Sequence, residues 1–85
     1  MELNELKNYV KKFEKETGFN KTKKEELLRM LQKEVNLLKK SKNKKVFDHQ
    51  LMDIQILILQ LANRYKTNLN SEWKKHWKNS EKYLK

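Results

Sequence analysis

Polar side chains interrupt the most apolar stretch of this 85-residue chain, MDIQILILQLANRY at residues 52–65. At 100° per residue, a helix that includes this stretch and the residues just before it carries four polar residues in one narrow sector: His49, Asp53, Gln60 and Arg64. A carboxylate beside such an apolar helix is costly to bury unless it is paired, hydrogen-bonded or bound to a metal. Asp53 is therefore either a partnered buried group or a charge near an exposed helix start that complements the helix dipole.

A second set of polar side chains suits the binding of phosphate. Lys75, Asn79 and Lys82 stand at positions i, i+4 and i+7, so they project from one side of a helix. Two ammonium groups and an amide over about ten Å of helix match the reach of a polyphosphate chain. The alternative is a solvated face, because lysines at this spacing are common in a chain so rich in lysine.

The charge of the chain favours an anionic partner. The formal net charge is +10, from 21 basic and 11 acidic residues, and only Arg29 and Arg64 of the basic residues are arginines. Nucleic acid, nucleotide phosphate and an acidic protein are the partners that such a charge attracts. Sequence-specific reading of bases favours the arginine fork over the lysine ammonium. Nucleic acid binding, if it occurs, is therefore expected to be non-specific and to use lysine–phosphate contacts.

The composition excludes sites that need cysteine, and the sequence predicts a cytoplasmic protein. The cytoplasm is that of a cell or of a virus-infected host cell. The chain has no cysteine, which excludes disulfides and thiolate metal sites. The N-terminus MELNELKNYVKKFEKE has no apolar core of a signal peptide. Residues 54–62 are strongly apolar but too short to span a bilayer, so no membrane partner is expected.

The spacing of apolar residues predicts four helices, at about 2–17, 22–40, 48–65 and 70–84. Gly18 suits the residue after a helix end, and Thr22 with Glu25 forms the pattern of a capping box. The lysine-rich segment KKSKNKK, residues 39–45, is predicted to be a loop.

These elements predict a single all-α domain over residues 1–85, a small antiparallel bundle of three to four helices with short loops. The third helix is apolar over most of its circumference, so it is expected to be central and surrounded. It has more apolar face than three small neighbours cover, so we expect a homo-oligomer to complete the bundle. The residues predicted to be mostly buried are Leu51, Ile54, Leu57, Ile58, Leu61 and Ala62.

Several motifs follow one another in the order of a known family. QLMDIQILILQLANRYKTNL holds an aspartate at the head of an apolar helix that ends in a Leu-Ala pair. The last helix contains EWKKHWKNSEKY, in which a lysine is followed four residues later by an asparagine and then by a basic residue and a tyrosine. Upstream, the segment LRMLQKEVNLL keeps one glutamate of a Leu-x-x-Glu-Glu-x-x-Glu-Leu helix. Over residues 22–84 this series resembles the MazG-type nucleotide pyrophosphohydrolases.

The resemblance implies a metal site. The family binds Mg²⁺ through Glu-x-x-Glu on one helix and Glu-x-x-Asp on the next, and oxygen ligands of this kind suit a hard cation. Glu34 and Asp53 keep two of these four positions, whereas Leu37 and Gln50 stand at the other two. Mg²⁺ is thus the implied cofactor, with Glu34 and Asp53 as its ligands and His49 as a candidate substitute, although imidazole suits Mg²⁺ poorly.

The resemblance also implies that Lys75, Asn79, Lys82 and Tyr83 bind the phosphates of a nucleotide. Three functions then compete. The first is a MazG-like nucleotide-binding or protein-interaction module that has lost catalysis, because two of the four metal carboxylates are missing. The second is an active nucleoside triphosphate pyrophosphohydrolase with a reduced metal site. The third sets the resemblance aside. It is a small basic helical protein that either binds nucleic acid or acts as a regulatory protein of the phage type.

Overall fold

The computed structural model describes the backbone of residues 2–84 and the side chains of residues 2–78. Within that part of the chain there are four α-helices, a short 3₁₀ turn and no strand, so the all-α prediction is confirmed. None of the helices described there is long and apolar enough to cross a membrane. The elements are α1 (Leu3–Thr17), η1 (Phe19–Lys21), α2 (Lys24–Lys39), α3 (Lys44–Arg64) and α4 (Leu69–Leu84).

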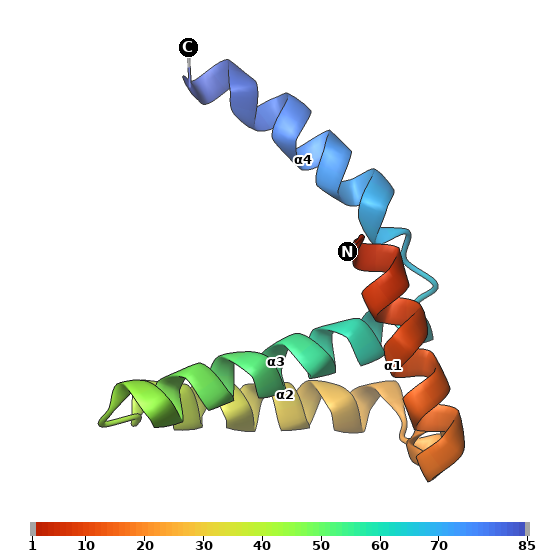
Figure 1. The fold of residues 1–85 in the computed structure, drawn as a ribbon, viewed down its shortest axis with the longest axis vertical. Coiled ribbons are helices and arrows are strands. Elements are labelled where there is room, and N and C mark those ends of the chain that lie inside the picture. Colours follow the sequence, from red (N-terminus) through yellow and green to blue (C-terminus); the bar gives the residue numbers. More distant parts are fainter. Residues whose placement is uncertain (1, 85) are drawn as a thin grey trace.

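Helices α2 and α3 form an antiparallel hairpin (Figure 1). Leu27 of α2 and Leu57 of α3 are buried, and the partly buried Leu31 and Leu38 extend the same stripe of α2 toward the tip of the hairpin. Apolar residues three and four apart form one helical stripe, which is why these two helices pack along their whole length.

Helix α1 crosses the end of the hairpin and covers only the C-terminal half of α3 (Figure 1). Leu59 and Ala62 of α3 are buried. The polar sector of α3 also serves this contact, because Arg64 and Gln60 both donate hydrogen bonds to the buried carboxylate of Glu14 on α1. Asn63 completes the contact by donating from its amide to the backbone carbonyl of Lys7.

The turn between α1 and α2 was predicted correctly at one residue and wrongly at another. Gly18 has φ of +82°, the left-handed conformation that glycine adopts without strain at a helix end. The predicted capping box does not form, since Lys23 stands at the N-cap position and no side chain caps the helix. Thr22 instead ends the 3₁₀ turn, where its N–H donates to Phe19 and its carbonyl accepts from Arg64.

Helix α3 begins at Lys44, four residues before the predicted start near Asp48. The prediction of a loop over residues 39–45 was therefore too wide. Asn43 caps the helix by accepting a hydrogen bond from the backbone N–H of Val46, at 2.9 Å. Lysine is a good helix former, and Lys44 pairs with Asp48 one turn later, so a run of lysines does not by itself prevent a helix.

Helix α4 leaves the hairpin as a projecting arm (Figure 1). It packs on the N-terminal end of α1 and runs away from α2 and α3, so the two long arms of the molecule form a V. The antiparallel pairing predicted for the bundle is thus seen in α2 and α3, while α1 crosses them and α4 stands apart.

The open shape leaves much surface uncovered. The radius of gyration is 14.8 Å, whereas a compact chain of this length has about 12 Å. The accessible surface is 7337 Å², and a compact 10.5 kDa monomer has about 5,400 Å². Of the six residues predicted to be buried, Leu57 and Ala62 are buried and Ile54 and Leu61 are half-buried. The prediction was wrong for Leu51 and Ile58, which are 45% and 40% exposed because none of the helices that the structure describes lies over them.

Candidate functional site

The hairpin brings the two expected metal ligands to the same level. The Lys24 ammonium of α2 lies 4.5 Å from the centre of the ring of Tyr65, the C-cap of α3, so the start of α2 lies beside the end of α3. Glu34 follows Lys24 by ten residues and Asp53 precedes Tyr65 by twelve, so the two residues lie in the same part of the hairpin.

Their surroundings do not form a full set of ligands. Asp53 is paired with His49 at 3.3 Å, one turn earlier on α3. Leu37, at another of the expected ligand positions, is a half-exposed hydrocarbon. Mg²⁺ takes six oxygens, and the residues that the structure describes include no group of three His, Cys, Asp or Glu side chains that could hold a metal. This donor set does not fit a tight Mg²⁺ site, so Mg²⁺ remains a prediction from the resemblance.

Two oxygen atoms between α2 and α3 lack partners. The Oε2 of Glu34 and the Oε1 of Gln50 are buried and accept no hydrogen bond. An unsatisfied buried acceptor costs about 1–3 kcal/mol, which gives these positions a local cost of folding. Both residues stand at positions that the resemblance assigns to metal ligands, and that assignment stays a prediction.

The expected phosphate-binding side chains are only partly described. Lys75 projects into solvent from α4 and lies 3.5 Å from Glu72 in an exposed ion pair. The side chains of the other three residues lie outside the described part of the chain: Asn79, Lys82 and Tyr83. Lys74 and Lys78 are also exposed on α4, so this helix is basic over its described length.

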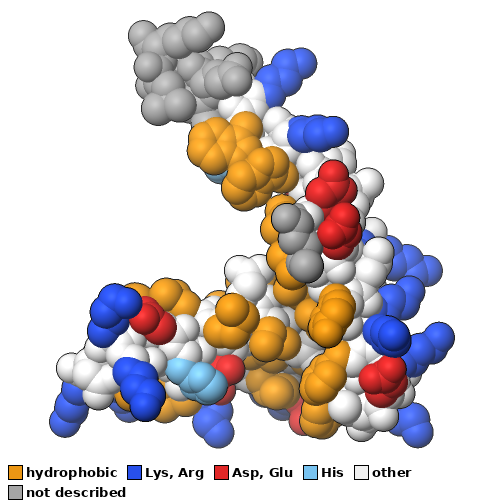
Figure 2. All heavy atoms as spheres, in the orientation of Figure 1, with side chains coloured by type: hydrophobic (Ala, Val, Ile, Leu, Met, Phe, Trp, Pro, Cys, Tyr) orange, Lys and Arg blue, Asp and Glu red, His pale blue; other side chains and the backbone are white. Residues whose placement is uncertain are grey.

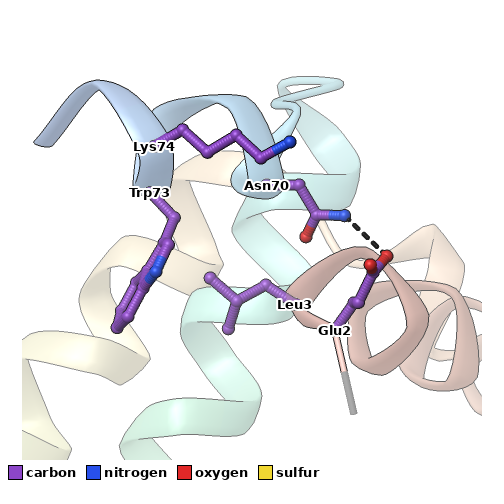
Figure 3. A pocket seen from close by; sticks show the side chains of 5 residues that line it. All are labelled: Glu2, Leu3, Asn70, Trp73 and Lys74. Atoms are coloured by element: carbon purple, nitrogen blue, oxygen red, sulfur yellow. Dashed lines mark hydrogen bonds between the residues drawn. The ribbon is translucent and has the colours of Figure 1, made fainter. Parts of the chain in front are cut away.

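A hollow of about 390 Å³ opens where α4 meets α1 (Figure 3). The indole of Trp73 and the side chain of Leu3 form its apolar part, and Lys74 reaches over it. Glu2 accepts a hydrogen bond from the Asn70 amide at 3.0 Å, beside the first turns of both helices. A carboxylate is stabilising there because helix N-termini carry partial positive charge.

One side of the hairpin presents a continuous uncovered apolar surface, here called the hairpin face. Each of its side chains is between about one third and just over one half exposed. The contact between Lys24 and Tyr65 shows that its two rows lie on the same side of the pair. On α3 the row alternates steps of four and three residues through half-buried Ile54 and Leu61, the spacing of a helix–helix seam. The hairpin face consists of Leu28 and Val35 from α2, of Phe47, Leu51 and Ile58 from α3, and of Tyr65, the C-cap of α3.

Lysines flank the hairpin face. On α2, Lys24 and Lys39 stand one turn before Leu28 and one turn after Val35, on the same helical side. Residues 18–43 hold eight basic and three acidic residues, so +5 of the net charge of +10 belongs to α2 and its flanking turns. The hairpin face is therefore apolar at its centre and positive at its edges.

A second uncovered apolar surface lies inside the V. Hydrophobic side chains gather on the side of α4 that faces α3, and further ones lie on α3 (Figure 2). Trp73 and Trp77 of α4 pack edge to face at 5.6 Å, yet they are 54% and 46% exposed. Met52 and Ile56 of α3 belong to the same helical row as the buried Leu59, but α1 does not extend over them. These four residues are called the V surface.

Sequence reasoning missed the partner of Arg64 and the two uncovered surfaces. Nothing in the spacing of α1 marks Glu14, which lies among exposed charges and is only 1% exposed itself. The hairpin face had a readable signal in the four–three alternation of apolar residues along α3. That signal shows a packing face but does not tell whether the partner helix comes from the same chain.

Comparison of the chain with protein-family models, with curated proteins and with solved structures found no match.

Proposed function

We propose that this chain acts by binding a protein partner, and that its hairpin face receives an acidic amphipathic helix. The observation that carries the proposal is the apolar row of α3, with Lys24 and Lys39 at its edges on the neighbouring helix. A helix laid along this row places its apolar stripe on Leu51 and Ile58 and its acidic flanks near the lysines.

The apolar centre supports a protein partner over nucleic acid. Phosphate contacts use lysines spread over a polar surface, whereas six partly exposed apolar side chains in one strip gain free energy when a partner removes them from water. The lysines then favour acidic partners over basic ones and speed the encounter.

Binding without catalysis also agrees with the MazG-like resemblance. Of the four expected metal positions, Leu37 has no ligand atom and Gln50 is uncharged. Asp53 already has a partner in His49. On this proposal the chain keeps a MazG-like arrangement of helices and uses the hairpin face to bind a protein partner. The alternative is that the lysines of α4 bind a nucleotide.

Titration of a labelled peptide tests the proposal. The probe is a synthetic amphipathic helix of about 20 residues with a leucine stripe and glutamate flanks, followed by fluorescence anisotropy. We expect Lys24→Ala with Lys39→Ala to weaken its binding at least about tenfold, because both lysines edge the bound helix. The matched control, Lys74→Ala with Lys75→Ala, removes the same charge from α4 and should leave peptide binding unchanged.

Each competing function gives a different pattern with the same two variants. Binding of nucleoside triphosphates is measured by calorimetry with and without Mg²⁺. If this binding is lost only in the variant with Lys74→Ala and Lys75→Ala, the result supports the nucleotide-binding module. Binding of duplex DNA that falls equally in both variants and declines steeply with salt supports a diffuse basic surface. Failure of the acidic peptide to bind better than a version with lysine flanks contradicts our proposal.

A further inference from the structure

A network of asparagines fixes the direction of the α4 arm. The side-chain amide of Asn4 donates to Asn68 at 3.0 Å, and its Oδ1 accepts from the backbone N–H of Leu69 at 3.1 Å. The backbone N–H of Asn4 donates to the Oδ1 of Asn70, also at 3.1 Å. Asn68 in turn caps α4 by accepting from the N–H of Ser71. The first turns of α1 and α4 thus cap each other.

The segment between α3 and α4 is held as well. The Lys7 ammonium donates to the carbonyl of Thr67 at 2.7 Å, and the N–H of Thr67 donates to the carbonyl of Ala62 at 2.9 Å. Lys66 takes a positive φ of +54°, which an ordinary residue adopts only at some cost. Since folding α4 back onto its own α3 breaks these contacts, the V surface cannot close within one chain while they hold.

The V surface nevertheless has two complementary halves. The arm offers the edge-to-face pair Trp73 and Trp77, and α3 offers Met52 and Ile56. The charged side chains of α3 nearest to Met52 and Ile56 are Asp48, which is paired with Lys44, and Asp53, which contacts His49. The described part of α4 has three lysines against one glutamate. The two halves therefore agree in apolar character, and the excess of lysine on the arm favours the side of α3 that carries Asp48 and Asp53.

We propose that the chain forms a homodimer in which the α4 arm of each copy enters the V of the other. Trp73 and Trp77 of one copy then pack on Met52 and Ile56 of the partner copy, and a two-fold axis makes both contacts at once. The surface in excess of a compact monomer is about 1,900 Å², and a stable interface takes about 800 Å² from each partner. One copy therefore has enough uncovered surface for this dimer and for the hairpin face, which stays open.

Disulfide trapping tests the exchange directly, because the chain has no cysteine of its own. Met52→Cys and Trp73→Cys are prepared as separate chains, mixed and oxidised gently. We expect a covalent dimer that joins one chain of each kind. The matched control replaces Met52→Cys with Leu51→Cys, which lies on the hairpin face of the same helix and should not cross-link to Trp73→Cys. Equal cross-linking in both mixtures, or none in either, overturns the proposal.

The variant with both cysteines in one chain distinguishes exchange from closure. A covalent dimer supports exchange, whereas a covalent monomer shows that the arm folds onto its own hairpin and overturns it. Sedimentation of the unmodified chain at about 50 µM should give about 21 kDa, twice the mass of one chain. Trp73→Glu with Trp77→Glu should give the monomer, and Tyr9→Glu, a similar change at an exposed aromatic residue of α1, should keep the dimer.

This inference and the proposed function are tested separately. The hairpin face and the V surface share no residue, so loss of dimerisation in Trp73→Glu with Trp77→Glu leaves peptide binding as its own measurement. A chain that stays monomeric at this concentration while binding the acidic peptide overturns the dimer alone.

Discussion

At the scale of single residues, one buried ion pair joins three parts of the fold. Arg64 reaches from the end of α3 to Glu14 on α1, with its Nη1 3.1 Å from the carboxylate. It also donates to the backbone carbonyls of Phe19 and Thr22, at 2.9 and 3.2 Å. A guanidinium suits this position because its planar fork has five donors, and three separate acceptors surround it.

Removing Arg64 should therefore cost more than the loss of one contact. Arg64→Ala leaves the carboxylate of Glu14 buried with only Gln60 as a donor, and an unpaired buried charge costs about 3–5 kcal/mol. The measurement is urea unfolding followed by circular dichroism. Lys44→Ala is the control, since it breaks the exposed pair with Asp48 and should change the free energy of unfolding by less than about 1 kcal/mol. Similar losses in the two variants contradict a structural role for the buried pair.

At the scale of helices, local chemistry decided several boundaries and long-range contacts decided the rest. The sequence was sufficient for the helical periodicity of all four helices and for the end of α1 at Gly18. It was insufficient for the turn at Thr22, where the carbonyl is held by Arg64 from a helix far along the chain. The expected core failed at Leu51 and Ile58 for the same reason, because spacing shows which residues face a partner but not where that partner comes from.

The early start of α3 rests on Asn43. Its side chain accepts the N–H of Val46, one of the helix-start groups that otherwise has no partner. Asn43→Ala should destabilise the fold by about 1 kcal/mol and fray the first turn of α3, which backbone amide exchange measured by NMR would detect. Asn36→Ala, at an exposed position inside α2, removes the same side chain without removing a cap and should not destabilise the chain. An unchanged exchange rate at Val46 in Asn43→Ala would show that the cap does not hold the helix start.

At the scale of the whole molecule, the main feature is how much apolar surface one chain leaves open. The hairpin face and the V surface lie on different sides of α3, and both are accessible to a partner. The sequence indicated this through a third helix with more apolar surface than its neighbours could cover. It could not indicate the arm, because the direction of α4 depends on hydrogen bonds between Asn4 at one end of the chain and Asn68 near the other.

The central claim is that the hairpin face is the surface on which a partner helix docks. Methyl NMR of the chain during titration with the acidic amphipathic peptide tests it most directly, because methyl signals report contact at single side chains. We expect saturable shifts on the hairpin face and unchanged signals for Met52 and Ile56 on the V surface. The hairpin-face methyl groups to be followed are those of Leu28, Val35, Leu51 and Ile58. Shifts confined to the V surface or to α4, or no shifts at saturating peptide, would contradict the account.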